Sequence, residues 1–440
     1  MRAPARPPAP AKGEALLRHR AAAGKVQMLP KCNVRGAEDF AVWYTPGVAE
    51  ACRAIVENAD AADECTNRAN LVAVVSDGTR VLGLGDIGPA AGLPVMEGKA
   101  LLFKYLGGVD AVPICLDTKE PDEIVKAVQW LAPSFGAINL EDIAQPKCFR
   151  VLAALRATLR IPVWHDDQQG TATVTLAGLT NALRITGRRP ETARIALIGV
   201  GAANVAVYRL LVQRGADPRN IVACDSVGTL HPGRGDIERL QETFPEKWRI
   251  CRETNSAGRT GKIADALQGA DVCLAFSTPG PGIIQPPWIA AMAKDAIVFA
   301  CANPVPEIWP DEALRAGARV VATGRSDFAN QVNNSLAFPG VFRGALDVRA
   351  RALTEGMALA AADALAAHAV ELGLRDDRIL PPMDDTEAVV RIAAAVGMQA
   401  QVERLARLPR PEAELRALAR AAIARSRRST EALAEAGLLG

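Results

Sequence analysis

The chain has 440 residues, which is enough for two or three domains with large hydrophobic cores. Hydrophobic residues make up 49% and charged residues 23%, the profile of an ordinary globular protein. A formal net charge of +2 gives no case for a nucleic-acid or membrane-surface partner. No run approaches the roughly 20 apolar residues needed to span a bilayer. We therefore expect no nucleic acid and no membrane among the partners.

The nine cysteines are scattered along the chain, and no two of them form a Cys-x-x-Cys pair. This pattern predicts reduced thiols in a cytoplasmic protein, and it implies neither a disulfide nor a metal site. The N-terminus is rich in Pro and Ala and lacks the apolar core of a signal peptide. Residues 1–15 are therefore predicted to form a disordered leader.

Residues 16–168 are predicted to form an N-terminal α/β domain, which begins with a mostly helical stretch at 16–69. Apolar runs with helical patterns between them then predict strands at 71–76, 81–84, 111–116, 137–140 and 161–164. This alternation predicts a parallel sheet with helices on its faces.

Pairs of acidic residues follow two of these predicted strands. Glu141 and Asp142 follow one strand, and Asp166 and Asp167 follow the last one of the domain. In open α/β proteins ligands bind at the carboxyl ends of the strands, and a nearby cation would offset the adjacent carboxylates. Taken alone, each pair is more consistent with a solvated acidic turn.

Lys99 lies in the segment Glu97-Gly98-Lys99, which is predicted to open a helix. A lysine in the first turn opposes the helix dipole, which lowers the pKa of its amine and favours a functional base. The ordinary alternative is a solvated surface lysine.

A second alternating unit occupies residues 169–350. A strand at 194–198 is followed by the run Gly199, Val200, Gly201, Ala202, Ala203 and Asn204. This run is close to the dinucleotide fingerprint, although Asn204 replaces its third glycine. Asp225 ends the next strand, 24 residues after Gly201, where an acid would bind the adenosine ribose.

Three more apolar strands, at 271–276, 296–300 and 319–322, end in Ser, Thr, Asn or Gly. Together these features predict a Rossmann-type doubly wound parallel sheet that binds NAD or NADP. Residues 351–440 are Ala-rich and are predicted to form a C-terminal helical segment, whose arginines line either a solvated face or a subunit contact.

The motifs jointly resemble the malic enzymes, specifically the short bacterial type, from about Leu16 to Ala367. The segments that carry this resemblance are Tyr-Thr-Pro-Gly-Val-Ala at 44–49, Thr-Arg-Val-Leu-Gly-Leu-Gly-Asp at 79–86, Glu-Gly-Lys at 97–99, Asn-Leu-Glu-Asp at 139–142, His-Asp-Asp-Gln-Gln-Gly-Thr-Ala at 165–172, and Asn-Asn-Ser at 333–335 with Phe-Pro-Gly at 338–340. Each segment alone is unspecific, but their order and spacing together are specific.

The resemblance implies oxidation of L-malate with NAD or NADP and decarboxylation of the product to pyruvate and CO2, in the presence of Mg²⁺ or Mn²⁺. By similarity, the metal ligands are Glu141, Asp142 and Asp167, an all-oxygen set of the kind that hard cations prefer. Lys99 corresponds to the general base, and Asp166 is the group that orients Lys99 or relays protons with it. The resemblance also implies that Tyr44 is the acid that protonates C3 of enolpyruvate.

The resemblance further places Arg80 on a malate carboxylate and Asn334 in hydrogen-bonding distance of the substrate. Asn303 would contact either the substrate or the nicotinamide ribose, and Thr278 would contact the cofactor. Two positions depart from the family pattern, because Asn204 replaces a small residue and Val227 replaces a commonly basic one.

The segment 231–261 is also divergent. It carries arginines that could meet a 2′-phosphate, at positions 234, 249, 252 and 259. Asp225 favours NAD over NADP on grounds of charge and hydrogen bonding.

The family pattern also implies a homodimer or homotetramer. Two other classes of function stay open on the sequence. One is a related dehydrogenase of another hydroxy-diacid or of an amino acid, and an amino-acid enzyme would work without a metal. The other is a non-catalytic nucleotide-binding regulator, which the presence of Tyr44, Lys99 and the three carboxylate ligands argues against.

Overall fold

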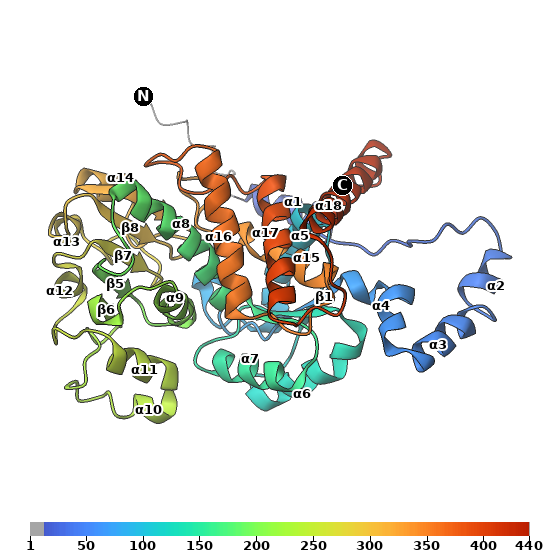
Figure 1. Ribbon diagram of the computed structural model, residues 1–440, viewed down its shortest axis with the longest axis horizontal. Helices are drawn as coiled ribbons and strands as arrows, with labels where there is room; N and C mark the ends of the chain where they lie inside the picture. The colour runs from blue at the N-terminus through green and yellow to red at the C-terminus, as the bar shows by residue number, and fades with distance from the viewer. Residues whose placement is uncertain (1–12, 440) are drawn as a thin grey trace.

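The structure is a computed structural model, and it describes residues 13–439. Two parallel sheets lie side by side with helices packed around both of them (Figure 1). This two-domain α/β architecture confirms the predicted fold class. Most of the predicted leader lies outside the described residues, and the first helix, α1, spans Glu14–Ala22.

The N-terminal stretch is helical, as predicted. Its elements are α1, α2 (Asp39–Trp43), α3 (Val48–Glu57), η1 (Ala59–Ala61), α4 (Ala62–Cys65) and η2 (Asn67–Asn70). No residue between positions 13 and 60 is buried. Helices α2 and α3 lie beyond α4, at the far end of the molecule from the second sheet (Figure 1).

The first sheet has the strand order β2-β1-β3-β4, and every neighbouring pair is parallel. Its strands are β1 (Leu71–Ser76), β2 (Asp110–Cys115), β3 (Ala137–Leu140) and β4 (Val163–His165). Helices α5 (Gly88–Gly107), α6 (Pro121–Leu131) and α7 (Lys147–Thr158) connect them. The central strands β1 and β3 are almost wholly buried, because both faces of the sheet are covered by helices.

The register of this sheet brings three strand ends together. Val75 pairs with Leu140, and Leu140 pairs with His165. Glu141 and Asp166 therefore emerge at the same edge of the sheet, as the sequence predicts. The apolar run at 81–84 is not a strand. It contains a 3-10 turn (η3, Leu82–Leu84), in which Leu82 and the following Gly85 both have positive φ angles.

The second sheet has the order β6-β5-β7-β8-β9 and is again parallel throughout. Its strands are β5 (Ile195–Ile198), β6 (Ile221–Cys224), β7 (Val272–Ala275), β8 (Ala296–Ala300) and β9 (Ala318–Thr323). The direction in which successive strands are added reverses between β5 and β7, and at such a switch point a doubly wound sheet opens a ligand crevice.

Helices cover both faces of the second sheet. They are α8 (Thr171–Thr186), α9 (Ala202–Gln213), α10 (Leu240–Thr243), α11 (Pro245–Glu253), α12 (Ile263–Leu267), α13 (Pro286–Ala290) and α14 (Pro310–Arg315). Short 3-10 turns also occur at η4 (Ala132–Ser134) and η6 (Pro218–Asn220).

After β9 the chain returns to the first domain. The closing elements are η7 (Asn334–Leu336), α15 (Phe338–Asp347), α16 (Glu355–Glu371), α17 (Thr386–Val402) and α18 (Glu412–Glu435). Phe103 of α5 lies 4.6 Å from Phe338 and 5.0 Å from Phe342, measured between ring centroids. This aromatic cluster joins the chain's last third to the helix that carries Lys99.

All nine cysteines are free, as the sequence predicts. Across residues 13–439, no helix combines the length and the apolar character that crossing a bilayer requires.

Candidate active site

The candidate site is centred on the turn between β4 and α8. Asp166–Gly170 forms one π-helical turn (η5), a feature that often marks functional sites. A side chain at Gly170 would collide with the Asp166 carboxylate, because an added Cβ would lie 1.9 Å from Oδ1. The indole of Trp164 donates a hydrogen bond to Asp166 Oδ1 over 3.1 Å. The turn therefore fixes a fully buried carboxylate at the edge of the sheet.

Lys99 meets this carboxylate from α5. Its Nζ lies 2.5 Å from Asp166 Oδ2 and 2.9 Å from Glu141 Oε1, and only 8% of the residue is exposed. The ring centroid of Phe338 is 4.4 Å from the same nitrogen. A buried lysine is thus held between two carboxylates and the face of an aromatic ring.

The prediction that Lys99 occupies the first turn of a helix is wrong. Helix α5 begins at Gly88, with Pro89 in its first turn, so Lys99 lies near the middle of its buried face. Burial acts to lower the pKa of Lys99, but the carboxylates of Asp166 and Glu141 outweigh it and raise the pKa. The helix dipole therefore plays no part, and the amine is charged in this state.

Two further carboxylates, those of Asp142 and Asp167, lie beside Asp166 and Glu141. The backbone N–H of Asp142 donates to Asp167 Oδ2 over 2.8 Å, and the Asn139 amide donates to Glu141 Oε2 over 2.8 Å. Asp142 Oδ2 is buried without a hydrogen-bond partner. Burial and the neighbouring Asp167 raise the pKa of Asp142 to about 8. The cluster has more carboxylates than cations.

This cluster is a set of donors rather than a closed cage. Within residues 13–439, no three His, Cys, Asp or Glu side chains converge into a ready metal site. The oxygen-only donors and the unpartnered Asp142 Oδ2 nevertheless fit a hard divalent cation, which favours carboxylate ligands and would neutralise the excess charge.

Arg80 lies on a loop beside this cluster. Its backbone N–H donates to Asp142 O over 3.0 Å, and its guanidinium donates to Leu82 O over 2.6 Å. The side chain is exposed, so it is available to an anion. The same loop contacts the second domain, because an added Cβ at Gly83 would lie 2.7 Å from Asn303 O.

The two asparagines predicted to contact substrate also lie around this cleft. Asn303 precedes Pro304 at the end of β8, opposite Gly83. Asn334 opens η7, and its Cβ would lie 3.3 Å from a Cβ built on Gly170. The structure therefore brings Arg80, Asn303 and Asn334 to the edge of the Lys99 cluster.

The fingerprint loop follows β5 at the switch point. Gly199 has a φ of +85°, and a Cβ there would lie 2.5 Å from Phe276 O, so glycine is required. A Cβ on Gly201 would meet open space at the N-terminus of α9, which is where a pyrophosphate is bound in such folds. The loop and first turn are completed by Val200, Ala202 and Ala203. Thr278 is exposed after β7.

Asn204 replaces the third glycine without disturbing this loop. The residue is fully buried, and its side-chain amide donates to Gly199 O over 2.6 Å and to Ile198 O over 3.1 Å. It also lies 3.2 Å from Leu274 O on β7. The bulkier residue is accommodated because it hydrogen-bonds the ends of two strands.

Asp225 ends β6, as predicted, but its carboxylate is already engaged. Arg234 donates to both of its oxygens over 2.9 Å, and Lys247 forms a second ion pair with it. Burial acts to raise the pKa of Asp225, but the hydrogen bonds from Arg234 and Lys247 lower it to about 2. Arg234 also binds Asp236, so this end of the crevice holds two acids and two cations.

Tyr44 is the one predicted catalytic residue that the chain does not bring to this cleft. It ends α2 on the protruding N-terminal stretch, and 70% of the residue is exposed. The sequence gives no indication of this separation, because the Tyr-Thr-Pro-Gly turn could lie on any face of the domain.

Two buried acids that shape the cleft are not predicted from the sequence. Glu307 accepts from Ser277 N over 2.7 Å and from Ala302 N over 3.1 Å, which joins the loops after β7 and β8. Asp77 accepts from Thr79 and pairs with Lys147 over 2.5 Å. Ser277 lies 30 residues from Glu307, and Lys147 reaches Asp77 from helix α7, so no local pattern indicates these two contacts.

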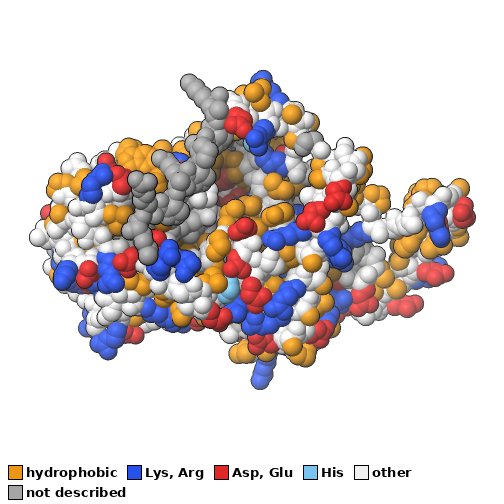
Figure 2. All heavy atoms as spheres, turned by 90° about the horizontal axis from the view of Figure 1, so that it is seen from above, with side chains coloured by type: hydrophobic (Ala, Val, Ile, Leu, Met, Phe, Trp, Pro, Cys, Tyr) orange, Lys and Arg blue, Asp and Glu red, His pale blue; other side chains and the backbone are white. Residues whose placement is uncertain are grey.

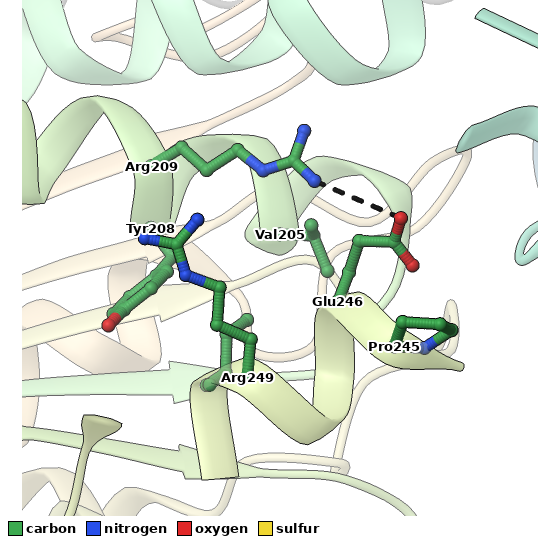
Figure 3. Close-up of a pocket in the computed structure, with 7 residues that line it drawn as sticks. Val205, Tyr208, Arg209, Pro245, Glu246 and Arg249 are labelled. Carbon is green, nitrogen blue, oxygen red and sulfur yellow. Dashed lines mark ion pairs between the residues drawn. The ribbon is translucent and has the colours of Figure 1, made fainter. Parts of the chain in front are cut away.

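A separate pocket of about 210 Å³ lies between α9 and α11 (Figure 3). Arg209 and Glu246 face each other across it, 4.0 Å apart, with Tyr208 and Arg249 beside them. Of the residues that the sequence indicates as candidate contacts, this pocket includes Arg249, one of the arginines that could meet a 2′-phosphate.

The fold and the site define a class of protein: a two-domain, dinucleotide-binding enzyme with a lysine and carboxylates between its domains. Residues 23–156 match the sequence profile of the malic enzyme N-terminal domain, and residues 168–401 match that of the malic enzyme NAD binding domain.

Individual relatives support the same assignment. The chain is 48% identical over 375 residues to an NAD-dependent malic enzyme of Geobacillus stearothermophilus, covering 85% of this chain and 76% of the relative. It is 43% identical over 390 residues to an NADP-dependent malic enzyme of Halomonas elongata, covering 85% and 90%. The crystal structure of Entamoeba histolytica malic enzyme superposes with a TM-score of 0.94 at 49% identity, covering 97% of this chain and 88% of that one. The chain belongs to the malic enzyme family.

Proposed function

We propose that the protein oxidises and decarboxylates L-malate to pyruvate and CO2 while reducing NAD or NADP. The observation that carries this proposal is the buried Lys99, paired with Asp166 and Glu141 at a sheet edge that faces the dinucleotide loop. A lysine held in this way is positioned to move a proton beside a bound dinucleotide, which supplies the hydride acceptor.

Glu141, Asp142 and Asp167 would hold Mg²⁺ or Mn²⁺, whose positive charge would stabilise the negative charge that develops on the substrate oxygens. Their excess negative charge and the unpartnered Asp142 oxygen support this assignment.

Arg80 and Asn334 of this chain would bind the carboxylates of the substrate. Arg80 is exposed beside Asp142 and suits a bidentate pair with a malate carboxylate. Asn334, next to Gly170, would donate a hydrogen bond from the opposite side of the cleft. These contacts would orient the C2 hydrogen toward the nicotinamide.

The Lys99 amine would first release its own proton to water by way of Asp166, and would then accept the C2 hydroxyl proton as the C2 hydrogen leaves as hydride for the dinucleotide. Asp166 positions the amine through the 2.5 Å ion pair and is itself held by Trp164. Loss of CO2 from the resulting keto acid leaves enolpyruvate. By the family resemblance, the hydroxyl of Tyr44 would give its proton to C3 of that enol and recover a proton from water, a role that requires the exposed Tyr44 to reach the Lys99 cluster.

We also propose a weak preference for NAD. Asp225 lies where the adenosine ribose would bind, and its charge disfavours a 2′-phosphate. Arg234 and Lys247 offset most of that charge, so the discrimination should be small. Sequence relatives of this chain include an NAD-dependent and an NADP-dependent malic enzyme.

We further propose that the protein is a cytoplasmic homodimer or homotetramer. Free cysteines throughout the chain suit a reducing compartment.

Steady-state kinetics with L-malate test the main proposal, using both dinucleotides with and without Mn²⁺. We expect reduced dinucleotide and pyruvate in equal amounts, and no turnover after chelation. Accumulation of oxaloacetate without pyruvate would contradict the proposal. So would turnover of an amino acid that survives chelation, which would indicate the alternative dehydrogenase class.

A further inference from the structure

Glu307 is a buried acid outside the Lys99 cluster. Figure 2 shows acidic side chains on the surface of the molecule, interspersed with lysines and arginines. Glu307 instead has no exposed surface, and it lies in the segment between β8 and α14. Burial of a carboxylate is costly unless hydrogen bonds satisfy its oxygens. The place of Glu307 in the fold therefore depends on the donors that surround it.

The donors to Glu307 come from two different loops. Ser277, in the loop after β7, donates to Oε1 from its backbone N–H over 2.7 Å and from its hydroxyl over 2.9 Å. Ala302, in the loop after β8, donates its backbone N–H to Oε2 over 3.1 Å. Each oxygen of the carboxylate thus holds one loop, and both oxygens act as acceptors.

Backbone hydrogen bonds join the same two loops. The N–H of Gly280 donates to Val305 O over 3.2 Å, and the N–H of Ile284 donates to Glu307 O over 3.1 Å. We call the joined segments 277–284 and 302–307 the double loop. Because the Glu307 side chain adds its own hydrogen bonds to these, the double loop is held as one unit at the carboxyl edge of the second sheet.

Asn303 lies between two fastened residues of the double loop. Its neighbour Ala302 is held by Glu307, and on its other side the Arg325 guanidinium donates to Pro304 O over 2.6 Å. Asn303 itself is half-buried. The place of Asn303 is therefore set by contacts that its neighbours make.

The double loop also meets the first domain at Gly83. A Cβ built on Gly83 would lie 2.7 Å from Asn303 O and 3.0 Å from a side-chain atom of Pro279, so both halves of the double loop approach this residue. Gly83 belongs to the loop of Arg80, which is proposed to bind a malate carboxylate. This contact fixes Asn303 against that loop.

We propose that Glu307 is a positioning residue of malate oxidation, which places Asn303 by holding the amide of Ala302 and by joining the two halves of the double loop. The inference rests on the proposed function, because that function gives Asn303 its contact with the substrate or the nicotinamide ribose. It goes further in assigning a role in turnover to a buried acid that has no exposed surface of its own.

Glu307→Gln tests this role, because it keeps the size of the side chain but leaves it one acceptor oxygen. That oxygen should stay with Ser277, which offers two donors, and the amide group should then oppose the N–H of Ala302. We expect kcat for malate oxidation to fall roughly 10- to 100-fold, since a small misplacement of a contact group has effects of this size. The Kd for NADH, measured by fluorescence, should stay close to that of the wild type, because the fingerprint loop is unchanged. Wild-type kcat, or equal losses in kcat and in NADH affinity, would overturn the proposal.

A double-mutant cycle shows whether Glu307 acts through Asn303. Asn303→Ala and Glu307→Gln are measured alone and in combination. If the acid acts by placing the asparagine, Glu307→Gln should lower kcat by less than about twofold in the Asn303→Ala background, because coupled residues are not additive. Losses that multiply independently would overturn the proposal.

Hydrogen exchange tests the same contact without turnover. In Glu307→Gln, peptides around Ala302 should exchange faster than in the wild type, whereas peptides around Ser277 should keep the wild-type rate. Glu242→Gln, which changes an exposed acid on α10, is the matched control and should alter neither. Unchanged exchange around Ala302 would overturn the proposal. If the wild type binds NADH but does not turn over malate, the proposed function fails, and the exchange rates alone decide whether Glu307 holds this loop.

Gly83→Ala disturbs Asn303 from the opposite side and leaves Glu307 intact, so it serves if Glu307→Gln does not fold. The added methyl group would lie 2.7 Å from Asn303 O and should displace Asn303. We expect a lower kcat with the NADH affinity retained. Wild-type kcat would show that turnover tolerates a displaced Asn303, and it would overturn the proposal.

Discussion

The carboxyl edges of the two sheets both carry carboxylates paired with cations, but their charge balance differs. At the first sheet one buried lysine faces four carboxylates, from Glu141, Asp142, Asp166 and Asp167. At the second sheet two acids, Asp225 and Asp236, are matched by Arg234 and Lys247.

The difference shows in the pKa values. Burial and Asp167 raise the pKa of Asp142 to about 8, whereas Arg234 and Lys247 overcome burial and lower that of Asp225 to about 2. An acidic cluster that is short of cations attracts one from outside, while a balanced cluster is already complete. The comparison supports the proposal that the first edge holds the metal and the second one recognises the dinucleotide.

Removing the single lysine of the unbalanced edge should have the largest effect. We expect Lys99→Ala to lower kcat for malate oxidation roughly 1000-fold, because the base is lost. Small primary amines in the assay should restore part of the rate. Lys104→Ala, on the same helix, is the control that should stay close to wild type. Normal turnover by Lys99→Ala would exclude the base.

Removing one negative charge from the carboxyl edge of the first sheet should have the second largest effect on kcat. Asp167→Asn should lower kcat roughly 100-fold and weaken the dependence of the rate on Mn²⁺ concentration, because one oxygen ligand loses its charge. Titration of the rate with Mn²⁺ measures this directly. Asp122→Asn, which changes an acid that is exposed on α6, should leave the titration unchanged. An identical Mn²⁺ titration for Asp167→Asn would remove it from the ligand set.

Tyr44→Phe should separate hydride transfer from the protonation of enolpyruvate. We expect pyruvate formation to fall roughly 100-fold, because the proton donor to C3 is lost. Reduction of oxaloacetate should persist, since that step does not use the tyrosine hydroxyl. Spectrophotometric assays of the two reactions on one preparation provide the comparison, and equal loss in both would contradict the assigned step.

Removing one cation from the carboxyl edge of the second sheet should have the smallest effect on catalysis. Arg234→Ala leaves the Asp225 carboxylate with one cation, so a 2′-phosphate is repelled more strongly. We expect the ratio of kcat/KM for NAD to that for NADP to rise about fivefold, the equivalent of about 1 kcal/mol. Arg315→Ala, which removes an exposed arginine on α14, should leave the ratio unchanged. A fall in the ratio would contradict the prediction, because it would mean that Arg234 favours NAD over NADP.

Much of this fold can be predicted from the sequence because its central strands are continuous apolar runs. The buried strand β1 and the matching strand β3 are examples, and the acids that follow such strands are placed correctly at the sheet edge. The start of α5 is not predicted, because the residues Gly88 and Pro89 have the composition of a loop. A helix that began at Glu97 would place Lys99 beside the positive end of the helix dipole. In the structure Lys99 lies between the carboxylates of Asp166 and Glu141 instead.

The remaining features depend on contacts between distant segments. Glu307 and Ser277 are 30 residues apart. Lys247, on helix α11, forms an ion pair with Asp225 at the end of β6. No local pattern of residues indicates such pairs. The ion pairs of Arg407 with Asp60 and Asp63 likewise join segments from opposite ends of the chain.

Asn204 has a consequence for the thermodynamics of dinucleotide binding. Its amide joins the ends of β5 and β7 through backbone carbonyls, so the two sides of the switch point are held together before any ligand arrives. A crevice that is fixed in this way loses little conformational entropy when it is filled, and more of the contact energy is expressed as affinity. Asn204 therefore holds the dinucleotide loop in its binding conformation before the dinucleotide binds.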